Sequence, residues 1–410
     1  MKTLNLFLLA TLILGVMSCK DDENDDNTDE SSVITDNITE DETWEGGNVY
    51  ELGDRISVTN GATLTIESGA IIKGQAGSGA NATALVIAKD GKINAKGTAA
   101  EPIIFTSIAD EIQPGDVKSP NLEPSQNGLW GGLIILGNAP ISADQNTDQV
   151  EGIPASDETG QYGGSSPGHD AGTLKYVSVR HGGANIGEGN EINGITLGGI
   201  GTGTTVENLE IVANQDDGIE CFGGTVNVDN VLVWNQADDA FDMDQAYKGT
   251  LDNIIAVEGS QSDHAFELDG PEGSASGTYT LKNGTIKGYN ENGTGGGEYA
   301  DLRDGAKANL QNLYFFNFSR SSDFELNDDE TVSNYLNDDV TFQNLEFNVS
   351  HLNEGNTKID SIFRVDEGQP QNAFDQKQPN ASVVSSSGVG ADKSKFGWTW
   401  ASEAGGLGDL

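Results

Sequence analysis

Two short segments of this 410-residue chain place acidic residues in the same repeated pattern. "NQDDGIEC" (residues 214–221) and "NQADDAFDM" (235–243) each contain two adjacent aspartates, followed by an acidic residue between apolar neighbours. Such carboxylates could bind a hard cation such as Ca²⁺ through their oxygens. Paired carboxyl groups are also what glycoside hydrolysis requires. The chemistry available to the chain therefore depends on the elements that position these acids.

Six segments share a second pattern, in which Asn comes two positions after an apolar residue and usually just before another. They are "VENLEI", "VDNVLV", "LDNIIA", "LKNGTI", "LQNLYF" and "FQNLEF", with Asn208, Asn230, Asn253, Asn283, Asn312 and Asn344. A second strand-like segment follows each of the first five, and Gly-rich loops without helical periodicity separate them. This repeat predicts an all-β fold, a single-stranded right-handed parallel β-helix.

A leucine-rich repeat is the alternative, because "VENLEIVAN" fits its template. The variable spacing of the asparagines and the strand-like, glycine-flanked "GIECFGG" favour the β-helix. In that fold each coil stacks on the previous one, so like residues form columns. Asn tolerates the left-handed backbone conformation that a bend between two strands requires, and its stacked amides can hydrogen-bond along the column.

The same stacking predicts three columns of acidic positions. The first contains Glu220, Asp242, Glu267, Asp301 and Glu325, and it points outward because its apolar neighbours point toward the core. The second contains Asp216, Asp238 and Asp263. The third contains Asp217 and Asp239 and continues with His264. We predict a binding surface formed by Asp216, Asp217, Glu220, Asp238, Asp239, Asp242, Asp263 and Glu267.

Stacked like charges destabilise a sheet by roughly 0.2–1 kcal/mol per pair unless they are neutralised. A Ca²⁺ ion held by Asp216, Glu220, Asp238 and Asp242 would neutralise them. Bridging by Lys248, Lys282 or Arg303 and a solvated acidic face are the alternatives. The lone Cys221 is expected to be a buried core thiol, equivalent to Met243 and Leu268 on later coils.

The N-terminal residues are typical of an exported protein. Lys2, the apolar run "LNLFLLATLILGV" and Ser18 precede Cys19, which resembles a bacterial lipoprotein signal peptide over residues 1–18 with Cys19 lipidated. An ordinary secretory signal is the alternative. Residues 19–43 are acidic and poor in apolar side chains, which predicts a disordered tether. The Lys-then-acid run after Cys19 resembles the export signal of surface lipoproteins in Bacteroidetes.

Residues 44–365 are expected to form the β-helix, and residues 366–410 a loop and a C-terminal cap over its open end. The alternative for Trp398 and Trp400 in "FGWTWAS" is a sugar-stacking platform. "GTAAEPIIFTS", "LWGGLIILG", "DDGIECFGGTV", "DDAFDMD" and "GWTWAS" resemble a family of parallel β-helix, pectin-lyase-like outer-membrane lipoproteins of Bacteroidetes. The resemblance implies a lipid-anchored, surface-exposed protein on the bacterial outer membrane, and it implies little about chemistry.

A formal net charge of −44 excludes nucleic acid as a partner, because binding it requires basic residues. The Gly-His-Gly and Arg-Ile-Lys motifs of polygalacturonases and the motifs of metalloproteases and esterases are absent, so no catalytic residue is assigned. We predict a non-catalytic lipoprotein that binds a glycan, an ion or a partner protein, with a TonB-dependent transporter or a polysaccharide as candidate partners. A polysaccharide-active hydrolase or lyase is the alternative.

Overall fold

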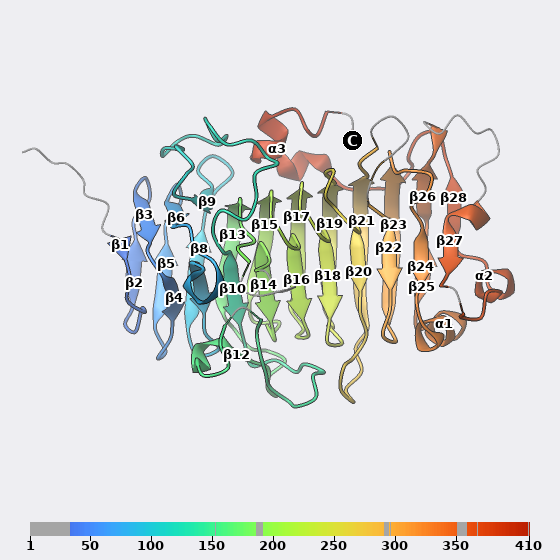
Figure 1. The fold of residues 1–410 in the computed structure, drawn as a ribbon, viewed down its shortest axis with the longest axis horizontal. Coiled ribbons are helices and arrows are strands. Elements are labelled where there is room, and N and C mark those ends of the chain that lie inside the picture. The colour runs from blue at the N-terminus through green and yellow to red at the C-terminus, as the bar shows by residue number, and fades with distance from the viewer. Residues whose placement is uncertain are drawn as a thin grey trace, which may run out of the picture. The chain divides into compact units, whose positions relative to one another are not determined.

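Apart from one antiparallel pair, the strands of the described residues belong to two parallel sheets (Figure 1). The computed structural model describes residues 33–151, 153–185, 192–290, 295, 297–350, 359–366, 368–408 and 410. These residues lie in one compact unit, Ser32–Leu410. The expected parallel β-helix is confirmed. The leucine-rich alternative is wrong, because both layers are built from strands.

The larger sheet has sixteen strands, which follow one another along the β-helix in parallel pairs. They are β1 (Val33–Ile34), β2 (Glu42–Trp44), β3 (Val49–Leu52), β5 (Thr63–Ile66), β6 (Ile71–Gly74), β8 (Lys92–Lys96), β9 (Ile103–Ser107), β13 (Gly172–Arg180), β15 (Thr205–Val212), β17 (Val228–Trp234), β19 (Thr250–Val257), β21 (Tyr279–Lys287), β23 (Ala308–Phe316), β25 (Thr341–Gln343), β26 (Leu345–Asn348) and β28 (Ala381–Val383).

The smaller sheet has ten strands, which carry the acidic positions. They are β4 (Arg55–Val58), β7 (Ala84–Ile87), β10 (Leu133–Leu136), β14 (Ile195–Gly198), β16 (Ile219–Phe222), β18 (Phe241–Asp244), β20 (Phe266–Leu268), β22 (Ala300–Leu302), β24 (Phe324–Leu326) and β27 (Phe363–Val365). A separate antiparallel pair, β11 (Asp148–Gln149) and β12 (Gln161–Tyr162), lies in the loop after β10. The α-helices of the described residues are α1 (Asp329–Leu336), α2 (Ala373–Gln376) and α3 (Trp400–Glu403).

The asparagine column lies at a bend within the long strands of the larger sheet. All six asparagines of the repeat have positive φ, between 55° and 62°. Their amides form a ladder: Asn253 Nδ2 donates to Asn230 Oδ1 at 2.7 Å, and Asn312 Nδ2 donates to Asn283 Oδ1 at 3.0 Å. Asn283 interrupts it by donating to Asp252. The predicted role of these asparagines at the bend is confirmed by their positive φ values. Asn adopts this left-handed backbone conformation with less strain than most other residues.

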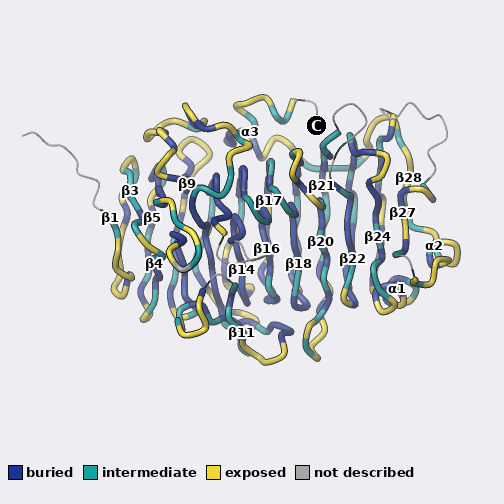
Figure 2. The backbone as a smooth tube through the Cα atoms, in the orientation of Figure 1, coloured by how far each residue is buried: buried dark blue, intermediate teal, exposed yellow. Residues whose placement is uncertain are grey.

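Inward-facing side chains fill the space between the sheets with one continuous apolar core. Buried residues accordingly recur along the strands of every coil (Figure 2). Cys221, Met243 and Leu268 are paired in register on β16, β18 and β20, and all three are fully buried. Burial raises the pKa of the Cys221 thiol, which keeps it protonated. The expected core role of Cys221 is therefore confirmed.

The β-helix begins before the expected boundary at residue 44. β1 pairs with β3 through Val33 and Glu51, and Ile38 forms a bridge with Val58. Part of the segment expected to be a tether therefore belongs to the β-helix. Cys19 and the signal peptide lie outside the described residues. Among the described residues, no helix is both long and apolar enough to cross a membrane.

The C-terminal segment covers the side of the larger sheet. Trp400 of α3 packs edge-on against Trp234 of β17, with 5.9 Å between ring centroids, and lies over the guanidinium of Arg180 on β13. Trp398 and Trp400 are both buried, so packing is their role and the sugar-platform alternative is wrong. The residues around Trp400 therefore lie beside the middle coils and not, as expected, across the open end, whereas α2 and β28 of the expected cap pack on the last coil (Figure 1).

Candidate functional site

One outward-facing column of the smaller sheet carries the acids of the first predicted column. The strand pairing places its members in the same register on successive coils. In order they are Thr196, Glu220, Asp242, Glu267, Asp301, Glu325 and Arg364. The structure thus brings together all five predicted acids and ends the column with a basic residue that the sequence reasoning missed.

A parallel column lies two residues later on the same strands. Because side chains alternate between faces, these residues share the outward face with the first column. Phe222 pairs with Asp244, and the next positions are Asp269 and Arg303. The signal for Asp244 and Asp269 was present in "FDMD" and "FELD", where a second acid follows the first after one apolar residue.

The third predicted column lies at the turn before these strands, and its aspartates bind the backbone of the next coil. Asp217 Oδ1 accepts a hydrogen bond from the N–H of Asp239 at 2.9 Å. Asp239 Oδ1 accepts one from the N–H of His264 at 2.7 Å. Each carboxylate therefore joins two coils as well as facing the acids of the sheet. The second column runs beside it, with the N–H of Asp263 bound to the carbonyl of Asp238.

Several of the acids are buried, which contradicts the alternative of a solvated acidic face. Asp217, Glu220 and Asp242 are 7%, 6% and 8% exposed. The loop that carries β11 and β12 contributes Glu151 to the wall, and Asn193 donates a hydrogen bond to Glu220 Oε2. These segments lie outside the repeat, so the periodic pattern gave no signal for the burial.

The buried acids line a cavity of about 320 Å³, called here the acidic cavity. It is lined by Glu151, Asp216, Asp217, Glu220, Asp238, Asp239, Asp242, Asp244, Glu267, Asp269 and Arg303. The set includes seven of the eight predicted binding residues. Asp263, the eighth, is exposed at the rim, with its carboxylate 3.9 Å from His264 Nδ1.

Burial and mutual repulsion raise the pKa values of the carboxyl groups in the acidic cavity. Burial is the main cause for Asp217, Glu220 and Asp242, and neighbouring carboxylates add to it. The same causes raise the pKa of Asp244 to about 8. Asp269 rises to a pKa of about 6, with Arg303 opposing the effect of burial. Proton uptake is thus one way for the cavity to reduce its negative charge, and a bound cation is another.

Arg303 is the basic residue in the lining of the acidic cavity. Its guanidinium forms an ion pair with Glu267, and its Nε donates to Asp269 Oδ1 at 2.8 Å. Of the other two predicted bridging residues, Lys282 pairs with Asp252 on the larger sheet at 3.0 Å, and Lys248 is exposed. Arg303 therefore fits the bridging role, and one guanidinium faces ten carboxyl groups.

A model of the pectate-lyase-like β-helix domain matches residues 36–402. The chain belongs to the pectate-lyase-like β-helix domain family. No curated protein and no solved structure matches the chain significantly. Membership of the family agrees with the parallel sheets described above.

In this pectate-lyase-like β-helix domain, the carboxylate oxygens of the acidic cavity are ligands of the kind that a hard cation prefers. Oxygens of Asp217, Glu220 and Asp242 lie within 4.8 Å of one another, as do those of Asp216, Asp217 and Asp238. The four residues predicted to hold Ca²⁺ thus fall in two adjacent groups that share Asp217. Asp242 Oδ1 is buried and accepts no hydrogen bond. A carboxylate oxygen in that position is strongly destabilising unless a proton or a cation satisfies it.

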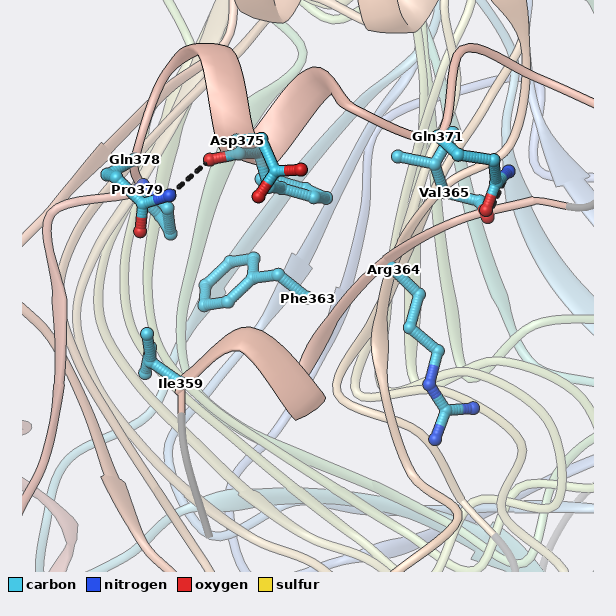
Figure 3. Close-up of a pocket in the computed structure, with 9 residues that line it drawn as sticks. Ile359, Phe363, Arg364, Val365, Gln371, Asp375, Gln378 and Pro379 are labelled. Atoms are coloured by element: carbon cyan, nitrogen blue, oxygen red, sulfur yellow. Dashed lines mark hydrogen bonds between the residues drawn. The ribbon is translucent and has the colours of Figure 1, made fainter.

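A second cavity, of about 260 Å³, lies between β27 and α2 (Figure 3). Two of its polar side chains bind nearby backbone: Gln371 Nε2 donates to the carbonyls of Val365 and Asp366, and Gln378 Nε2 donates to the carbonyl of Phe374. Arg364 forms an ion pair with Asp323. Since these contacts stabilise the last coil, we regard this cavity as structural.

Proposed function

We propose that this pectate-lyase-like β-helix domain binds a glycan through a cation held in the acidic cavity. The observation that carries the proposal is the oxygen cluster of Asp217, Glu220 and Asp242, in which the buried Asp242 Oδ1 has no hydrogen-bond partner. A divalent ion such as Ca²⁺ would bind that oxygen and reduce the repulsion among the neighbouring carboxylates.

The number of oxygens explains how a glycan could join the site. Ca²⁺ takes about six to eight oxygen ligands. Three or four carboxylates leave several positions for hydroxyl or carboxylate oxygens from a sugar. The column continues beyond the cluster through Glu267, Asp301 and Glu325 to Arg364. A chain of sugars could therefore lie along several coils of the outward face.

The geometry favours binding over cleavage. Glycoside hydrolysis needs two carboxyl groups about 5 Å or more apart, whereas oxygens of Glu220 and Asp242 lie within 4.8 Å of each other. Arg303 would be the candidate base of a lyase. Burial lowers its pKa, but Asp269 and Glu267 outweigh burial and raise the pKa above its usual value, so Arg303 keeps its proton.

Affinity electrophoresis tests the proposal directly. The purified chain would be run in gels that contain polygalacturonate or neutral plant and microbial glycans, each with Ca²⁺ or with a chelator. We expect at least one glycan to retard the wild type only when Ca²⁺ is present. The double variant Glu220→Gln, Asp242→Asn should lose this retardation.

Asp229→Asn is the matched control, because Asp229 is an exposed acid of β17 on the other sheet. It should behave as the wild type does. Retardation that persists in the chelator, or in the double variant, would contradict a cation-mediated site. Unsaturated or shortened glycan products would instead favour the enzymatic alternative.

For location, we propose that lipidation of Cys19 anchors the domain on the outer membrane, facing outward. The lipoprotein-like residues before Cys19 and the acidic run after it support this proposal. A TonB-dependent transporter would then be a suitable partner for a glycan-binding protein. Replacing Cys19 with Ala should release the protein from the membrane fraction.

A further inference from the structure

His264 lies in the third column, one coil after Asp239, and carboxylates surround its ring nitrogen Nδ1. This atom is 2.9 Å from Asp239 Oδ1, 3.8 Å from Glu267 Oε2 and 3.9 Å from Asp263 Oδ2. Arg303 holds the other oxygen of Glu267, so Oε2 is the one that faces the ring. Ligand atoms of Asp239, His264 and Glu267 lie within 4.8 Å of one another.

The distances between His264 Nδ1 and the carboxylate oxygens are close to the distance between two ligand atoms of one metal ion. Ligand atoms bonded to Zn²⁺ at about 2.0–2.2 Å in a tetrahedron are about 3.4 Å apart. The distances from Nδ1 to Asp239 and to Glu267 lie on either side of this value. The backbone N–H of His264 holds the Asp239 carboxylate beside the ring, which is the usual role of a hydrogen bond behind a metal ligand.

Two neighbouring carboxylates have buried oxygens without a hydrogen-bond partner. Glu258 is 4% exposed and neither of its oxygens accepts a hydrogen bond. Gly297 lies against this carboxyl group, where a Cβ atom would collide with Glu258 Oε2. Asp301 is 6% exposed, and its Oδ1 also has no partner. His264 is within electrostatic range of both.

One imidazolium cannot donate hydrogen bonds to all of these carboxylate oxygens. A protonated Nδ1 carries a single N–H, and the 2.9 Å contact to Asp239 would use it. Both oxygens of Glu258 and Oδ1 of Asp301 would still have no hydrogen-bond partner. A divalent cation bound to Nδ1 would supply more charge, and its open coordination positions would accept oxygens or water.

We propose that Asp239, His264 and Glu267 form a second cation site, for an ion of the Zn²⁺ type. Imidazole nitrogen is a ligand that transition metals prefer, whereas hard cations such as Ca²⁺ prefer oxygen. The all-oxygen cluster of Asp217, Glu220 and Asp242 and this nitrogen-containing cluster therefore select different ions. The proposal goes beyond the cation-dependent glycan binding described above and does not require it.

Thermal melting of the tag-free, metal-free full chain tests this site, with ZnCl₂ or CaCl₂ added. Zn²⁺ should raise the melting temperature of the wild type by a few degrees, because it binds the folded state. His264→Gln should lose this rise. His264→Lys should lose it too, because it keeps a positive charge but removes the imidazole ligand. His169→Gln is the control and should keep the full response, since His169 lies elsewhere, against the carbonyl of Lys89.

A wild type that does not respond to Zn²⁺, or a His264→Gln variant that keeps the response, would overturn the proposal. Should the variants fail to melt cooperatively, Co²⁺ bound to the wild type gives a second readout. Its visible spectrum should show nitrogen ligation, and a spectrum of oxygen ligands alone would overturn the proposal. A Ca²⁺ response lost in Asp242→Asn but kept in His264→Gln reports on the other site, so the two proposals fail separately.

Discussion

The outward column of the smaller sheet has opposite chemistry in two stretches of the β-helix. On β7 and β10 its members are Val86 and Ile134, which are buried under the loop that carries β11 and β12. On β16 and β18 they are Glu220 and Asp242, which line the acidic cavity. The backbone and the register are the same in both stretches, so only the side chains differ. The β-helix thus stabilises itself in the first stretch and exposes ligand atoms to a cavity in the second.

The largest loss of stability should come from placing a carboxylate, as found in the second stretch, at an apolar position of the first. Ile134→Asp would bury an unpaired charge in the apolar cluster that also contains Ile141 and Tyr162. We expect a loss of about 3–5 kcal/mol in the free energy of unfolding, measured by urea denaturation. Ile134→Val is the control and should lose about 0.5–1.5 kcal/mol. A tolerated Ile134→Asp would show that the two stretches are equivalent.

The sequence was sufficient to predict the coils and the acidic columns because both repeat. The apolar–x–Asn pattern located the bend at Asn208 and its equivalents, and the register followed from it. Burial of Glu220 was not predictable in this way, since Glu151 and Asn193 come from segments that occur once. A residue from a segment that occurs only once belongs to no periodic pattern, so its position depends on tertiary packing alone.

The C-terminal segment was misplaced for the same reason. Two tryptophans in a terminal segment predict burial, and that was confirmed. They carry no information about which surface accepts them. The outward-facing Trp234 and Leu232 of β17 form part of that surface, and they look like ordinary strand residues in the sequence.

A smaller effect should be a pH dependence of the free energy of unfolding, which the carboxyl groups of the acidic stretch cause. The folded-state pKa values of Asp269 and Asp244, about 6 and about 8, lie above the value of about 3.9 for an unfolded chain. The folded state therefore holds more protons, so this contribution to stability is complete below about pH 4 and is lost as pH rises through about 6 and then 8. In chelator, we expect the free energy of unfolding to fall by on the order of 1 kcal/mol per pH unit.

Asp244→Asn should reduce this slope between about pH 6 and pH 8, where Asp244 itself titrates. Urea denaturation of the wild type and the variant over a pH series gives the comparison. Stability that rises with pH over this range would mean that the carboxyl groups of the acidic cavity are stabilised in their charged form without a cation.

The most direct measurement of the central claim is a calorimetric melt with Ca²⁺ and with chelator. Ca²⁺ at about 100 times its dissociation constant should stabilise the wild type by about 2.7 kcal/mol and raise its melting temperature by several degrees. The double variant Glu220→Gln, Asp242→Asn should melt cooperatively without this rise, while Asp229→Asn keeps it. A wild type that melts identically in Ca²⁺ and chelator, or a double variant with the full rise, would contradict a cation site at these carboxylates.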